Sequence, residues 1–163
     1  MTVLSRGLVV WLIASMALPG CATPVKREPL QVLMVCEHGS VKSLMAASLF
    51  NKEAAQRHLP YRALSRGVRP DAAVPAPIAA SLTKEGFDVA GFVPSRVSAT
   101  DVAQAARVVV IGIEPEALGA QASATMDAWQ DVPAASVDYA AASAALQKHI
   151  TALLDDLEKS GSQ

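Results

Sequence analysis

The sequence predicts an α/β fold: a four-stranded parallel sheet with helices on both faces. Segment 107–113, "RVVVIGI", is almost continuously β-branched, which is typical of a strand buried on both faces. Segments with apolar residues at helical spacing separate the predicted strands. Strands that alternate with helices form parallel sheets, because each connection has to cross back over the sheet. At 163 residues, the chain has the length of one such domain.

Strands are predicted at 30–35, 61–67, 107–113 and, with the sequence "TMDAW", at 125–129. A first helix is expected over Ser43–His58, ended by Pro60, and a second over 76–85, closed by Gly86. Ser98 or Thr100 is expected to cap a short helix that continues to Ala106. A long C-terminal helix follows residue 136, with one apolar face formed by Leu146, Ile150, Leu153, Leu154 and Leu157.

The N-terminus has the pattern of an export signal. The apolar run from Leu8 to Leu18 is too short to cross about 30 Å of hydrocarbon, but it suits the central region of a signal peptide. The sequence "LPGC", which ends at Cys21, resembles the lipobox of bacterial lipoproteins, in which the cysteine is acylated. We therefore expect a signal peptide at 1–20, lipidation at Cys21, a tether at 21–29 and a domain at 30–160. The protein would then be membrane-anchored on the periplasmic side. An ordinary signal peptide cut nearby, or an uncleaved anchor, are the alternatives.

Charge and cysteine content exclude several classes of function. The 14 basic and 15 acidic residues nearly balance, and no basic run is present, which argues against a nucleic-acid surface. No Cys, His or Asp spacing suggests a metal site, and no cofactor is expected. If Cys21 carries lipid, Cys36 is the one free thiol, so no internal disulfide can form.

Cys36 stands where the first predicted strand ends and a loop, 37–41, leads to a helix. A helix N-terminus has unpaired N–H groups that favour negative charge, including that of a thiolate. Gly39 permits the backbone conformation that lets loop amides converge on an anion. The position therefore combines a nucleophile with an anion site, although a buried structural cysteine at a strand end is the plainer interpretation.

The segment "VCEHGSVKSLMAA" resembles the signature of low-molecular-weight protein tyrosine phosphatases and of arsenate reductases with the same fold. That signature is a cysteine, five residues, an arginine, and then Ser or Thr. Segments "SRGV", 74–98, "ARVVVIG" and "WQDVPAAS" resemble further family segments in the same order, so the resemblance covers 30–155. It implies a three-layer sandwich with strand order 2-1-3-4.

The resemblance also implies residue roles. Cys36 would be the nucleophile, Ser43 would hydrogen-bond its thiolate, and Asp131 would protonate the leaving group and then activate water. Ser65 would support the loop together with Ser40. The anion would be held by the loop residues Glu37, His38, Gly39, Ser40, Val41 and Lys42, mainly through backbone amides. His38 would neighbour the anion or point to solvent.

Three features depart from the family pattern. Lys42 stands where the family has arginine, so a single ammonium replaces a guanidinium that grips two oxygens. Arg66, in the "SRGV" turn, or nearby Arg69 is a candidate to compensate. Asp131 is separated by Val132 from the proline that usually follows it directly, and the aromatic residues that the phosphotyrosine enzymes have right after the acid are replaced by Val132-Pro133-Ala134-Ala135. No further cysteine follows the third strand, which thioredoxin-coupled arsenate reductases require.

We therefore expect hydrolysis of phosphate monoesters, of the phosphotyrosine type, through a cysteinyl-phosphate intermediate, weakened by Lys42. One alternative is a non-catalytic anion-binding lipoprotein of the same fold. Another is an arsenate reductase that uses an external thiol. The expected partners are a phosphate or arsenate-type anion and, through the N-terminal lipid, a membrane.

Overall fold

The computed structural model describes residues 28–121 and 126–161. Its centre is a sheet of four parallel strands in the order β2-β1-β3-β4, which confirms the predicted order. The strands are β1 (Leu30–Cys36), β2 (Tyr61–Gly67), β3 (Ala105–Ile111) and β4 (Met126–Trp129). The expected signal peptide, the lipobox and most of the tether lie outside the described residues.

Four α-helices connect or follow the strands: α1 (Lys42–Gln56), α2 (Ala76–Lys84), α3 (Ala99–Gln104) and α4 (Tyr139–Gly161). The expected cap of α3 is present, because Ser98 and Asp101 form a reciprocal capping box. A 3₁₀ segment, η1 (Pro115–Gln121), was not expected from the sequence. Within the described residues, no helix is long and apolar enough to span a bilayer.

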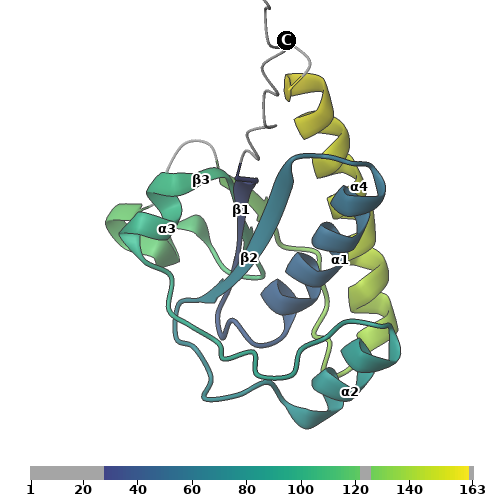
Figure 1. Cartoon of the computed structure of the whole chain (residues 1–163). Helices are drawn as coiled ribbons and strands as arrows, with labels where there is room; N and C mark the ends of the chain where they lie inside the picture. The colour runs from purple at the N-terminus through teal and green to yellow at the C-terminus, as the bar shows by residue number, and fades with distance from the viewer. Residues whose placement is uncertain (1–27, 122–125, 162–163) are drawn as a thin grey trace, which may run out of the picture.

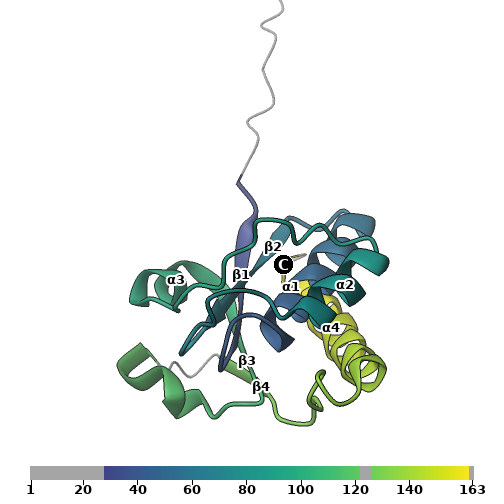
Figure 2. The same ribbon diagram turned by 90° about the horizontal axis from the view of Figure 1, so that it is seen from below.

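The sheet separates two apolar cores of unequal size. Figure 1 shows α1 and α4 on one side of the sheet and α3 on the other, and Figure 2 shows the same layers from below. Because successive residues of a strand face opposite sides, Val32 and Met34 of β1 enter the larger core with α1 and α4. Leu33 and Val35 enter the smaller core. This burial on both faces explains the continuous apolar runs of the inner strands.

Parallel strands have all their carboxyl ends at one edge of the sheet, where ligands of open α/β folds bind. Cys36 is the last residue of β1, and Lys42 is the first residue of α1, so the connecting loop lies at this edge. The ends of β2, β3 and β4 bring Gly67, Ile111 and Trp129 to the same edge.

Candidate active site

The loop that follows Cys36 packs directly on the end of β2. Gly39 has a positive φ of 68°, and a Cβ there would lie 2.8 Å from the backbone nitrogen of Gly67. A Cβ on Gly67 would in turn lie 2.7 Å from the nitrogen of Gly39. Two glycines are therefore needed where the two backbones touch. Gly67 was not among the expected site residues, although its place in the "SRG" turn was a signal for it.

The sulfur of Cys36 is in hydrogen-bond contact with polar groups of the loop and of α1. Its Sγ lies 3.0 Å from Ser43 Oγ and accepts a hydrogen bond from the Gly39 N–H at 3.2 Å. Ser65 Oγ lies 2.9 Å from Ser43 Oγ and 3.0 Å from the Gly39 carbonyl oxygen. Cys36, Ser43 and Ser65 are all buried. The structure thus brings together the three side chains to which the resemblance assigned roles as nucleophile, thiolate partner and loop support.

Helix α1 begins without a side-chain cap. The N-cap residue is Val41, which cannot accept a hydrogen bond from the first turn. Most helices use Ser, Thr, Asp or Asn at this position to bind those N–H groups. Without such a side chain, the first-turn N–H groups and the positive end of the helix dipole stay available to an anion.

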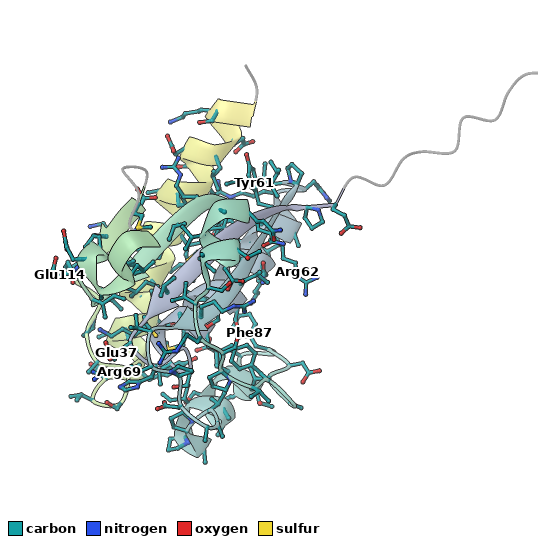
Figure 3. The ribbon with its side chains drawn as sticks, turned by 90° about the vertical axis from the view of Figure 1, so that its left-hand side faces the viewer. Glu37, Tyr61, Arg62, Arg69, Phe87 and Glu114 are labelled. Atoms are coloured by element: carbon teal, nitrogen blue, oxygen red, sulfur yellow. The ribbon has the colours of Figure 1, made fainter. Side chains whose placement is uncertain are left out.

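Backbone and side-chain bonds fix the outer side of the loop to the segment after β2. The N–H of Arg69 donates to the Glu37 carbonyl at 2.8 Å, and that of Asp71 donates to the His38 carbonyl at 3.1 Å. The fully buried hydroxyl of Ser40 donates to the Asp71 carboxylate. The side chains of Glu37 and Arg69 form an ion pair at 2.5 Å, and Figure 3 shows them together at this end of the molecule.

A cavity of about 210 Å³ opens beside Cys36. It is lined by Glu37 and His38 of the loop, by Val41 and Lys42 at the start of α1, and by Ile111 and Gly112 at the end of β3. The segment after β4 also lines it through residues 134–136, with the sequence Ala-Ala-Ser. The lining contributed by residues 134–136 carries no carboxyl or aromatic side chain.

Lys42 reaches across the base of this cavity. Its ammonium donates to the carbonyl oxygen of Val132 at 2.7 Å. The side chain passes over Gly112, where a Cβ would lie 2.6 Å from Nζ. Lys42 therefore supplies a positive charge in the cavity and also connects α1 to the segment after β4. An ammonium has three donors, so two remain for an anion.

Neither arginine that was considered as compensation for Lys42 reaches the cavity. Arg66 donates to the Asp101 carboxylate at 3.0 Å and to the Ser65 carbonyl at 2.9 Å, which directs it toward α3. Arg69 pairs with Glu37, is 75% exposed, and does not line the cavity. In this structure Arg66 is thus directed away from the cavity, and its contact with an anion stays a prediction.

Asp131 is not placed beside Cys36 either. Its carboxylate is 67% exposed and lies 2.6 Å from Nε2 of His149, a ring that stacks on Trp129 with 4.8 Å between centroids. The hydrogen bond from His149 lowers the pKa of Asp131, which makes the carboxyl a poorer proton donor. Asp131 does not line the cavity. The cause is local: Val132 turns inward and is buried, so its neighbour Asp131 turns outward.

The described residues contain no group of three or more His, Cys, Asp or Glu side chains that could hold a metal ion. The chemistry available in the cavity is therefore that of one thiol, its hydroxyl partner, the backbone amides and the side chains of Glu37, His38 and Lys42.

Comparison with solved structures gives the same fold. YfkJ from Bacillus subtilis is 18% identical, with a TM-score of 0.69 over 83% of this chain and 98% of that chain. The YwlE arginine phosphatase from Geobacillus stearothermophilus is 19% identical, with a TM-score of 0.66 over 81% of this chain and 95% of that one. A thioredoxin-dependent arsenate reductase from Corynebacterium glutamicum is 16% identical, with a TM-score of 0.66 over 83% and 65%.

A search of curated protein sequences gives no match. Among family models, that of the low molecular weight phosphotyrosine protein phosphatases matches residues 31–128. This match spans more than half of the chain and includes Cys36, the loop, the whole of β2 and β3, and all but one residue of β1 and of β4. The chain therefore belongs to the low molecular weight phosphotyrosine protein phosphatase family.

Proposed function

We propose that the protein hydrolyses phosphate monoesters through Cys36. The thiolate attacks phosphorus, an S–P bond forms, and the P–O bond to the leaving group breaks with its electron pair going to that oxygen. Water then attacks the phosphocysteine, inorganic phosphate leaves, and the thiolate is restored. Ser43 stabilises the thiolate as it leaves, through the 3.0 Å contact with Sγ.

The observation that carries this proposal is the set of polar groups around the Cys36 sulfur. Gly39 N–H and Ser43 Oγ are both directed at Cys36 Sγ, at the uncapped start of α1 and at the edge of a 210 Å³ cavity. Cys36 borders the larger apolar core, but its sulfur also has these polar partners, which a purely structural cysteine does not need. A thiol hydrogen-bonded in this way, next to N–H groups that favour anions, is suited to attack a tetrahedral phosphate.

The cavity favours esters of the phosphotyrosine type over esters of polar alcohols. Val41, Ile111, Ala134 and Ala135 give it apolar walls against which an aryl group can lie. Phenolic oxygens are also better leaving groups than alkyl oxygens, which suits a site without a carboxylic acid on the facing wall. Lys42 binds the phosphoryl group as a point charge, so we propose a slower reaction than with arginine.

The test is turnover of para-nitrophenyl phosphate by the full chain and by two cysteine variants. Cys36→Ser is expected to abolish turnover, whereas Cys21→Ser, which removes the other cysteine of the chain, is expected to retain it. Mass spectrometry of acid-quenched wild-type protein is expected to show phosphate on Cys36. Turnover that survives in Cys36→Ser would refute the proposal.

A second candidate, an anion-binding protein without turnover, is favoured by one observation. The ammonium of Lys42 is already bonded to the Val132 carbonyl, and the wall at 134–136 offers no carboxyl group. Calorimetric titration with inorganic phosphate distinguishes the two. Saturable binding by wild type, combined with no hydrolysis and no phosphocysteine, would favour the binding protein.

Arsenate reduction would instead require arsenate-dependent oxidation of an added small thiol, because Cys36 is the single cysteine in the described residues.

We also propose that Cys21 carries lipid and anchors the domain on the periplasmic side of a membrane. The support is the sequence pattern that ends at Cys21. Labelling of cells with a radioactive fatty acid is expected to mark wild type but not Cys21→Ser. An unlabelled wild-type protein, recovered in the soluble fraction, would contradict the anchor.

A further inference from the structure

The cavity has a nucleophile but no evident proton donor for the leaving group. Among the described residues that line it, the ionisable side chains besides Cys36 are Glu37, His38 and Lys42. Glu37 is paired with Arg69 and is therefore an anion, and Lys42 donates to a backbone carbonyl at the base. His38 is the one that remains for proton transfer.

The surroundings of His38 determine which ring nitrogen is free. Nδ1 lies 3.2 Å from the carbonyl oxygen of Arg69 and 3.4 Å from a carboxylate oxygen of Asp71. Both of these oxygens accept and cannot donate at neutral pH, so Nδ1 carries the hydrogen. Nε2 is therefore the nitrogen that gains and loses a proton, and no described group is hydrogen-bonded to it.

The partners of His38 are themselves fixed. The Asp71 carboxylate accepts the hydrogen bond of the buried Ser40, and the Asp71 N–H binds the His38 carbonyl at 3.1 Å. The backbone of Arg69 is also fixed, because its N–H donates to the carbonyl oxygen of Glu37. A carboxylate that orients one nitrogen of a histidine, so that the other does the chemistry, is a known arrangement of general acid–base catalysts.

We propose that His38 is the general acid and base of the reaction at Cys36, in the role that the sequence suggested for Asp131. This inference rests on the proposed function. When the S–P bond forms and the P–O bond breaks, the imidazolium gives its Nε2 proton to the leaving oxygen and becomes neutral. When water attacks the phosphocysteine, neutral Nε2 takes a proton from the water, so the starting state is restored.

The charged groups that face His38 come from three segments. Its own loop supplies Cys36 and Glu37, the segment after β2 supplies Arg69 and Asp71, and α1 supplies Lys42 across the cavity. The active state requires a thiolate at Cys36 together with a protonated His38.

The experiment compares two substrates and three variants of the full chain. Para-nitrophenyl phosphate has a leaving group that needs little protonation, whereas phenyl phosphate has one that needs it. His38→Asn keeps an N–H for the Arg69 carbonyl but cannot transfer the proton. It is expected to lower kcat for phenyl phosphate by about 100-fold or more, with a much smaller fall for para-nitrophenyl phosphate. Asp131→Asn and His149→Asn are the controls, and neither change is expected to alter this ratio.

The results separate this inference from the proposed function. One outcome would overturn the role of His38 and leave the proposed function standing. In it, turnover depends on Cys36, and His38→Asn either lowers the turnover of both esters equally or leaves both unchanged. Selective loss in Asp131→Asn instead would assign the proton transfer to Asp131. Absence of turnover by wild type on both esters would overturn both proposals. Equal inhibition by inorganic phosphate in wild type and His38→Asn is expected, because anion binding stays intact.

Discussion

Gly67→Ala is expected to disable the site through one methyl group. The new Cβ would lie 2.7 Å from the Gly39 nitrogen and 2.7 Å from the His38 carbonyl carbon, whereas ordinary contacts begin at 3.4 Å. One of the two backbones therefore has to move by about 0.7 Å. Gly67 is held by hydrogen bonds from its N–H to Ser95 O and from Val97 N–H to its carbonyl, both at 2.9 Å. The loop after Cys36 is thus the part that shifts.

The size of the effect follows from that displacement. Misplacement of catalytic groups by about 1 Å can cost about 100-fold in rate, so a shift of about 0.7 Å is expected to lower kcat/KM by roughly 10- to 100-fold. Crowding of this kind also costs about 1–3 kcal/mol of stability. The backbone of Gly67 does not have a positive φ, so the effect isolates the collision from conformational strain.

Two measurements check this reasoning: turnover of para-nitrophenyl phosphate and urea unfolding followed by circular dichroism. Gly161→Ala is the matched control, because the nearest atom to its Cβ is Tyr61 Oη at 3.7 Å, an ordinary contact at the end of α4. The control is expected to be neutral in both measurements. A folded Gly67→Ala protein with wild-type turnover would show that the position of the loop does not depend on this contact.

Three further changes test other parts of the structure. Ser43→Ala is expected to lower kcat by about 10- to 100-fold, because a hydrogen bond to a charged sulfur is worth about 1.5–3 kcal/mol. Unchanged single-turnover and steady-state rates would contradict this. Lys42→Arg is expected to raise kcat/KM by about 10-fold or more through bidentate contact with phosphoryl oxygens; equal rates would show that the charge alone suffices. Tyr139→Phe is expected to keep or raise the free energy of unfolding by up to about 1 kcal/mol, because the buried Tyr139 hydroxyl lies near Glu85 but makes no hydrogen bond of normal geometry in the described residues. Burial, with the nearby Glu85 charge, raises the pKa of Tyr139 from 10.0 to about 12. The free energy of unfolding of the wild type therefore falls as pH rises from about 10 to 12. Urea unfolding in that range is expected to show a smaller fall for Tyr139→Phe.

The sheet could be predicted from the sequence because local patterns determine it. Apolar runs with β-branched residues located β1 and β3, short segments between helical patterns located β2 and β4, and the family resemblance supplied the strand order. The ends of elements were less exact: β3 begins at Ala105 rather than 107, and α4 begins at Tyr139 rather than near 136. Segment η1 has no apolar periodicity, and its Gly119 interrupts the helical backbone, so no local pattern indicated it.

The inner part of the site was predictable for the same reason. Cys36, Gly39 and Ser43 lie within eight residues, and one strand–loop–helix unit positions them. The outer part depends on contacts between distant segments, such as that of Lys42 with Val132, 90 residues away. Whether Asp131 or Val132 turns inward depends on which side chain the core accepts, and Val132 is the apolar one. Arg66 was likewise captured by Asp101, a partner 35 residues away that sequence spacing does not reveal.

Two distant parts of the chain line the cavity, and this affects how the substrate preference of such a protein can evolve. In the proposed reaction, the loop after Cys36 binds the phosphoryl group, whereas Ala134, Ala135 and Ser136 line the part of the cavity left for the group attached to it. Substitutions at Ala134 or Ala135 can therefore alter the preference among esters while the affinity for inorganic phosphate stays the same. Recognition of the anion and choice of its carrier can thus evolve independently on one scaffold.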